Sequence, residues 1–204
     1  MEKIIIGIEK RISLGVMELA LRAMLEGTAK SEYFYELAEE ECTGTTRAKK
    51  TVAVINRMTL KNKLQPYIME NKNTVESMLR NKFDRPLLFV SMMSGAYSLF
   101  YDALAILGKY FHVQEQVNRE FLIKKLSEKY GNNRMLYVAF DCVMPMLVEA
   151  GFISRPQPGI YEMCRQSKFT SDAKQIYEKS FMVNNEELAQ NGINENNPYF
   201  EFIK

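Results

Sequence analysis

The sequence predicts a mainly α protein, in which an N-terminal helical bundle is followed by a winged-helix-like region with one short β-hairpin. Apolar residues recur every three or four positions through most of the chain, which is the spacing of amphipathic helices. Residues 86–107 form a long apolar segment, and the segments after it have the order helix, turn, helix and hairpin of a winged helix. We therefore divide the chain into a helical region with a basic helix at 1–112, a winged-helix-like region at 113–183 and a C-terminal tail at 184–204.

The first two predicted helices are amphipathic. The first begins after the candidate N-cap Ser13, and its apolar positions have helical spacing: Leu14, Met17 and Leu21. The second contains the apolar residues Tyr33 and Leu37 and carries a run of carboxylates: Glu32, Glu36, Glu39, Glu40 and Glu41. Because such a run at helical spacing normally forms a solvated face, we expect these side chains to lie on the surface.

A basic segment follows directly. Residues 43–69 contain six Lys or Arg and no Asp or Glu, although the net charge of the whole chain is only +2. We expect a helix over 45–63, capped by Thr45 or Thr46. Wound at helical pitch, it places four cations within roughly an 80° arc, opposite an apolar side: Arg47, Lys50, Arg57 and Lys61. This concentration of positive charge favours a polyanionic ligand.

The apolar segment at 86–107 is long enough to cross a bilayer and contains a single charged residue, Asp102. Three serines, two tyrosines and Gly95 weaken its tendency to insert. An Asp near the centre of a span costs about 2.5–3.5 kcal/mol on insertion scales. The sequence therefore predicts a continuous buried helix in the core and no membrane association.

The winged-helix-like region is expected to begin with a helix over 113–131 whose inward positions are Val117, Phe121, Leu122 and Leu126. After a Gly-Asn-Asn turn comes a second helix, 134–150, and then a hairpin over 152–163. The second helix has the position of a recognition helix, but its only charged residues from 135 onward are Asp141 and Glu149, which repel phosphate. We expect this helix to be buried and Arg155, in the hairpin, to be free to contact a nucleic-acid backbone.

The C-terminal tail, 184–204, is rich in Asn and Glu and ends with an aromatic cluster formed by Tyr199, Phe200 and Phe202. Two interpretations remain open from the sequence. The tail is either a loosely held arm or a docking peptide.

Motifs for enzymatic chemistry are absent from the sequence. It has no phosphate-binding Gly-rich loop and no metalloprotease motif, and its single histidine is His112. The three cysteines, Cys42, Cys142 and Cys164, form no CxxC pair and are odd in number. We therefore predict no catalytic residue, metal, cofactor or small-molecule substrate. The apolar stretch near the start is too short for a signal peptide, so a reducing cytoplasm is the expected location.

The basic segment is the predicted functional site. Its structural alternative is that the cations merely solvate a helix, paired with the carboxylates before it. The functional interpretation is a surface for double-stranded DNA that contacts the backbone without reading bases, since no base-reading group accompanies the cations. The candidate contact residues are Thr46, Arg47, Lys49, Lys50, Arg57, Lys61, Lys63 and Arg155.

Three segments together carry a family resemblance: TGTTRAKKTVAVINRM, PLLFVSMMSGAYSLFYDALAILGKYF, and a helix ending LVEAGFI before a short hairpin. In this order they resemble the BrxA family of bacteriophage exclusion (BREX) defence systems, over about residues 9–180. The resemblance implies a small helical, non-enzymatic DNA-binding accessory subunit that works with other defence proteins. It places the family's basic segment on Arg47, Lys49, Lys50 and Arg57. The chain departs from the family at 136–140, where members often carry basic residues in the penultimate helix.

Two other functions fit parts of the pattern. The acidic and basic helices could serve subunit docking in a protein-interaction adaptor. A winged-helix transcription regulator would instead prefer one operator and form a dimer, but the basic residues are not on the helix that would read the bases.

Overall fold

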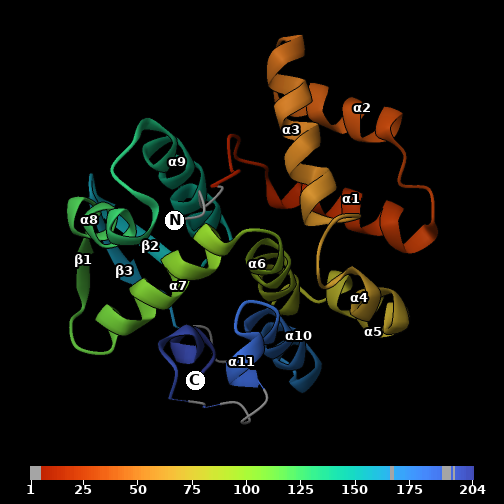
Figure 1. Ribbon diagram of the computed structural model, residues 1–204. Helices are drawn as coiled ribbons and strands as arrows, with labels where there is room; N and C mark the ends of the chain where they lie inside the picture. Colours follow the sequence, from red (N-terminus) through yellow and green to blue (C-terminus); the bar gives the residue numbers. More distant parts are fainter. Residues whose placement is uncertain (1–5, 166–167, 190–193, 195) are drawn as a thin grey trace.

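The computed structural model describes residues 6–165, 168–189, 194 and 196–204 (Figure 1). Within these ranges the chain forms eleven α-helices and one three-stranded antiparallel sheet, which confirms the predicted fold class. The N-terminal helices are α1 (Leu14–Glu26), α2 (Ser31–Glu41), α3 (Thr45–Met58), α4 (Gln65–Glu70), α5 (Lys72–Arg80) and α6 (Asp84–Ala96). The remaining elements are α7 (Ser98–Phe111), β1 (Gln116–Asn118), α8 (Arg119–Tyr130), α9 (Arg134–Glu149), β2 (Ile153–Gln157), β3 (Ile160–Met163), α10 (Ser171–Met182), α11 (Glu186–Ala189) and a 3₁₀ helix, η1 (Pro198–Ile203).

Helices α2 and α3 form a hairpin that stands above α1 in Figure 1. The predicted cap of α1 is confirmed, since Ser13 Oγ accepts a hydrogen bond from the amide of Val16 at 3.3 Å. The hairpin buries apolar residues from both helices, which are Phe34, Leu37 and Ala38 on α2 and Ala48, Val54, Ile55 and Met58 on α3. The apolar side of the basic helix is therefore core, as its sequence pattern predicts.

Helix α3 ends five residues earlier than predicted, at Met58. The side chain of Asn62, which is buried, donates to the carbonyl oxygens of Met58 and Met92, both at 2.7 Å. Thr59 Oγ1 also donates to the carbonyl oxygen of Ile55 at 2.7 Å. These side chains take the place of the next helical amides, so Lys61 and Lys63 lie in a turn and not on the helical arc.

The prediction of one continuous apolar helix over 86–107 is wrong, because the chain breaks at Tyr97 between α6 and α7. Tyr97 is extended, with φ −137° and ψ 111°, and buries its ring. Nearby, a Cβ at Gly95 would lie 2.7 Å from Asn62 Oδ1, so only glycine allows this close approach. Both helices are core elements, and no helix within the described ranges combines the length and hydrophobicity that a bilayer crossing requires.

The second region has the connectivity of a winged helix. Its strand order is β1-β3-β2, with α8 and α9 between β1 and β2. The predicted hairpin is confirmed, but the helix predicted from 113 begins only at Arg119, because Val117 pairs with Tyr161 in the sheet. Helix α7 contacts both α8 and β1, and so takes the place of the first helix of the winged helix. The predicted division at 112 therefore runs between elements that pack together.

The end of the described chain is packed into the core. Helix α10 lies against α6, and η1 lies against α7. The ring of Tyr199 stacks on that of Tyr177 with centroids 4.3 Å apart, and Tyr177 Oη donates to the carbonyl oxygen of Tyr199 at 2.7 Å. Against the same face of α7, a Cβ at Gly108 would lie 2.0 Å from the carbonyl oxygen of Pro198. The loosely held arm is therefore excluded for the aromatic cluster, while residues 190–193 and 195 of the tail lie outside the described ranges.

Candidate nucleic-acid interface

The first turn of α3 is exposed and has no capping side chain. The N-cap is Gly44, with φ 99°, and not Thr45 or Thr46 as predicted. The carbonyl oxygen of Gly44 accepts the amides of Arg47 and Ala48 at 3.0 and 3.1 Å. In the described structure this leaves the amides of Thr45 and Thr46 without a protein acceptor, as donors that a phosphate oxygen can use.

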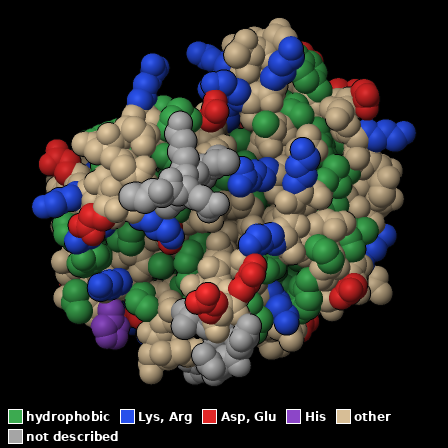
Figure 2. All heavy atoms as spheres, viewed as in Figure 1, with side chains coloured by type: hydrophobic (Ala, Val, Ile, Leu, Met, Phe, Trp, Pro, Cys, Tyr) green, Lys and Arg blue, Asp and Glu red, His purple; other side chains and the backbone are tan. Residues whose placement is uncertain are grey.

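Three of the exposed cations on and just after α3 have no side-chain hydrogen bond to any residue that the structure describes: Arg47, Lys49 and Lys61. None of them forms an ion pair with any other residue that the structure describes. Figure 2 shows Lys and Arg side chains over α3 in the upper part of the view. These three cations are free to bind an external anion without breaking an internal contact.

Two further predicted cations have exposed ionic partners. Lys50 Nζ lies 2.5 Å from Glu9 Oε2, and the Lys50 side chain is 48% exposed. Lys63 Nζ lies 3.2 Å from Glu186 Oε1 and donates to the carbonyl oxygen of Val183 at the same distance. Because exposed pairs of this kind contribute only about 0–1 kcal/mol, phosphate can compete for either lysine at small cost.

Arg57 has a structural role in the fold. Its Nε donates to the carbonyl oxygen of Ala96 at 3.1 Å, and its guanidinium carbon lies 4.9 Å from the centroid of the Tyr97 ring. Burial is the main cause that raises the pKa of Tyr97, to about 12, and the neighbouring Arg57 charge opposes that rise. The side chain thus fastens α3 to the break between α6 and α7, so it is the least available of the α3 cations.

The acidic helix does not neutralise the basic one. Among the described residues, no carboxylate of α2 lies within ion-pair distance of a cation of α3. Glu41 Oε2 instead accepts the amide of Ser13 at 3.3 Å. The two helices pack through their apolar sides and form no ion pair with each other in the described structure.

A cleft of about 730 Å³ lies between the hairpin and α9. Its charged residues are mixed, with three cations and four carboxylates: Lys10, Arg11 and Arg47, and Glu9, Glu40, Glu41 and Asp141. Lys10 was not predicted as a site residue, since its acidic and basic neighbours in the sequence gave it no distinctive signal. The excess of carboxylates disfavours a phosphate chain inside the cleft, so the outer surface of α3 is the better anion site.

Helix α9 differs from its prediction in one respect, because only part of it is buried. Leu136, Phe140 and Val143 are core residues, but Tyr137 and Val148 are exposed. Its two carboxylates are paired: Asp141 Oδ1 lies 2.7 Å from Arg119 Nη2, and Glu149 Oε2 lies 2.7 Å from Arg11 Nη2. Arg155, on β2, is exposed and belongs to this region of the fold and not to the α3 surface.

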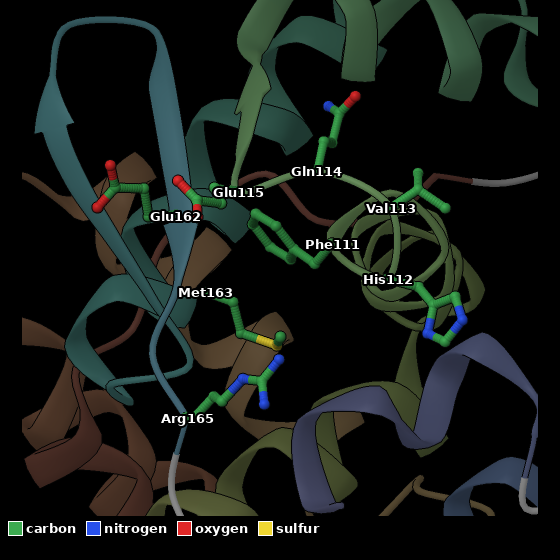
Figure 3. Close-up of a pocket in the computed structure, with 8 residues that line it drawn as sticks. All are labelled: Phe111, His112, Val113, Gln114, Glu115, Glu162, Met163 and Arg165. Atoms are coloured by element: carbon green, nitrogen blue, oxygen red, sulfur yellow. The ribbon is translucent and has the colours of Figure 1, made fainter.

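A second hollow, of about 520 Å³, lies between the end of α7 and strand β3 (Figure 3). Figure 3 shows Phe111 directed into it, with Glu115 and Glu162 on one side and Arg165 on the other. His112 points away from its centre, and its Nδ1 lies 3.4 Å from Glu201 Oε2. The hollow has no Ser, Thr or Cys in its lining, and the described residues contain no group of His, Cys, Asp and Glu that could hold a metal ion.

Comparison of the chain with protein-family models, with curated proteins and with solved structures finds no match.

Proposed function

We propose that this chain is a non-enzymatic DNA-binding accessory protein of a bacterial phage-defence system of the BREX type, acting in the cytoplasm with other defence proteins. The observation that supports DNA binding is the set of exposed cations on and just after α3 that have neither an ionic partner nor a side-chain hydrogen bond among the described residues: Arg47, Lys49 and Lys61. The assignment to phage defence is supported by the sequence resemblance to the BrxA family.

Binding through this surface is expected to be independent of base sequence. The surface offers guanidinium and ammonium groups with the free amides of Thr45 and Thr46, all of which suit phosphate oxygens. The only Asn or Gln of α3 is the partly exposed Asn56, so no set of base-reading amides accompanies the cations. If three to four cations contact phosphates, log affinity falls against log salt concentration with a slope of roughly −3.

The test is a salt titration with a labelled random-sequence duplex of roughly 30 base pairs, about three helical turns. The variant reverses the three unpaired cations, Arg47→Glu, Lys49→Glu and Lys61→Glu. Arg57 is left intact because it supports the fold. The matched control reverses three exposed cations outside α3, at Arg80, Lys109 and Lys124.

The α3 variant should flatten the salt slope and the control should keep it. Both variants change the net charge equally, so a difference between them reflects the position of the cations and not the net charge. Failure of the wild-type protein to bind at low salt overturns the proposal, as does an equal loss in the two variants. Single-stranded DNA and RNA of the same length, measured beside the duplex, establish which nucleic acid is preferred.

A protein-docking role is favoured by a separate observation, the apolar side chains exposed on α9. A transcription regulator is less well supported, because the exposed charges on α9 are Arg134 and the two paired carboxylates Asp141 and Glu149.

A further inference from the structure

Helix α9 exposes apolar side chains where a winged helix would present its groove-reading residues. Seven large hydrophobic residues are exposed in the described part of the chain, and three belong to α9: Met135, Tyr137 and Val148, at 39%, 38% and 37%. Tyr137 and Val148 are eleven residues apart and share one side of the helix. Met135 lies on the other side of the helix, so Tyr137 and Val148 define the candidate protein-binding side of α9.

A small pocket lies at the C-terminal end of this surface, between α9 and the β2–β3 hairpin. Its volume is about 320 Å³, and its apolar lining comes from Met144, Pro145, Val148 and Tyr161. Met144 and Tyr161 are buried, whereas Val148 is open to solvent at the edge. The volume is at the lower limit of small-molecule sites, about 300–1,000 Å³, so it suits one or two apolar side chains of a partner.

The rim of the pocket has one cation available for a ligand. Both carboxylate oxygens of Glu149 have partners, because Oε2 pairs with Arg11 at 2.7 Å and Oε1 accepts a hydrogen bond from the amide of Leu14 at 2.9 Å. Arg155 is exposed, and no ion pair to it exists among the described residues. The pocket therefore combines an apolar floor with one unsatisfied guanidinium.

We propose that the exposed side of α9 and this pocket form a docking surface for another protein, which inserts an apolar side chain beside a carboxylate. The apolar side chain fills the pocket as an anchor, and the carboxylate binds the Arg155 guanidinium in bidentate geometry. Nucleic acid is the wrong occupant, because the lining of the pocket is mainly apolar and Arg155 is the one cation on its rim without a carboxylate partner among the described residues.

A second copy of this chain is a poor occupant of the site. Its acidic helix, α2, uses its apolar residues Phe34 and Leu37 in the hairpin with α3. Its aromatic segment, η1, is packed against α7. Neither of these two segments is therefore available, and we assign the complementary segment to a different protein.

The test uses the full chain and short fluorescent peptides that place one Leu, Phe or Trp between Asp residues. Matched peptides replace the Asp residues with Lys, or the apolar residue with Ser. Fluorescence anisotropy measures affinity, and amide chemical-shift changes locate the site. The acidic apolar peptides should bind at least tenfold more tightly than both matched sets, and the shifts should map to Val148, Arg155 and Tyr161.

Arg155→Glu should weaken peptide binding at least tenfold, and so should Val148→Asp. Val148→Ser, a milder change, keeps the test valid where Val148→Asp unfolds the protein. Lys124→Glu is the control and should change nothing. The proposal fails if acidic and basic peptides bind equally, if the shifts map elsewhere, or if Val148→Asp abolishes a concentration-dependent dimer of this chain instead of peptide binding. The α3 triple variant should retain peptide binding, which separates this result from the DNA-binding proposal.

Discussion

Helices α3 and α9 are similar in length, and each presents one side to solvent, but the two sides have opposite chemistry. Helix α3 combines the unpaired cations Arg47 and Lys49 with a complete absence of carboxylates. Helix α9 combines exposed apolar residues with carboxylates that are already paired. We therefore infer each ligand from the pairing state of the charges and not from the position of a helix in a winged-helix fold.

The largest expected effect is a loss of duplex binding in the α3 variant and not in the α9 variant. At about 0.1 M salt each phosphate contact contributes close to one power of ten in affinity, so reversing Arg47, Lys49 and Lys61 should weaken duplex binding by about a hundredfold or more. Val148→Asp should leave it unchanged. Fluorescence anisotropy with one labelled duplex measures the affinities of both variants. The contrast between the two helices fails if the α9 variant also loses duplex affinity.

The second effect separates the structural cation of α3 from its binding cations. Arg57→Ala removes the hydrogen bond to the Ala96 carbonyl and the contact with the Tyr97 ring. We expect the free energy of unfolding to fall by about 1–3 kcal/mol, measured by urea denaturation. Lys49→Ala, an exposed control on the same helix, should change it by no more than about 0.5 kcal/mol. Equal destabilisation by the two changes would contradict the structural role of Arg57.

The third effect concerns the ion pair of Lys50. Removing its partner with Glu9→Gln frees the ammonium group and deletes a negative charge beside α3. Because an exposed pair contributes about 0.2–1 kcal/mol, duplex affinity should rise by a factor of about 1.4 to 5. The matched change Glu128→Gln, which frees Lys125 on α8, should have no effect on affinity. A fall in affinity with Glu9→Gln would show that this pair positions α3 instead of competing with DNA.

The smallest expected effect is on α9 itself. Arg134 is exposed at the first position of this helix, where a winged helix commonly contacts the backbone. If α3 alone binds DNA, Arg134→Glu changes duplex affinity by no more than about twofold, in keeping with one distant charge screened by salt. A tenfold loss in the same titration would extend the DNA surface to α9 and remove the contrast between the helices.

Local signals in the sequence were enough to predict the Ser13 cap, the apolar side of α3 and the β2–β3 hairpin. The early end of α3 could not be predicted, because Asn62 is held there by the Met92 carbonyl, which is distant in sequence. The strand β1 escaped prediction for the same reason, since three residues become a strand only through pairing with β3.

The candidate site was predicted only in part. Sequence showed where the cations are concentrated, but their availability depends on residues far along the chain. Glu9 and Glu186 pair with Lys50 and Lys63 only after folding. No composition rule could have separated Arg57, which is structural, from Lys49, because both are simply basic residues on one amphipathic helix.

The packing of η1 on α7 also affects how the protein is made. Gly108 leaves the ribosome about 90 residues before Pro198, the residue that packs against it. At a synthesis rate of roughly 5–20 residues per second, η1 is completed about 5–20 seconds after the apolar face of α7. During that interval Tyr101 and Phe111, both buried in the finished fold, are open to water and to other nascent chains. The interval before η1 is synthesised is therefore the period in which α7 is most open to non-native association.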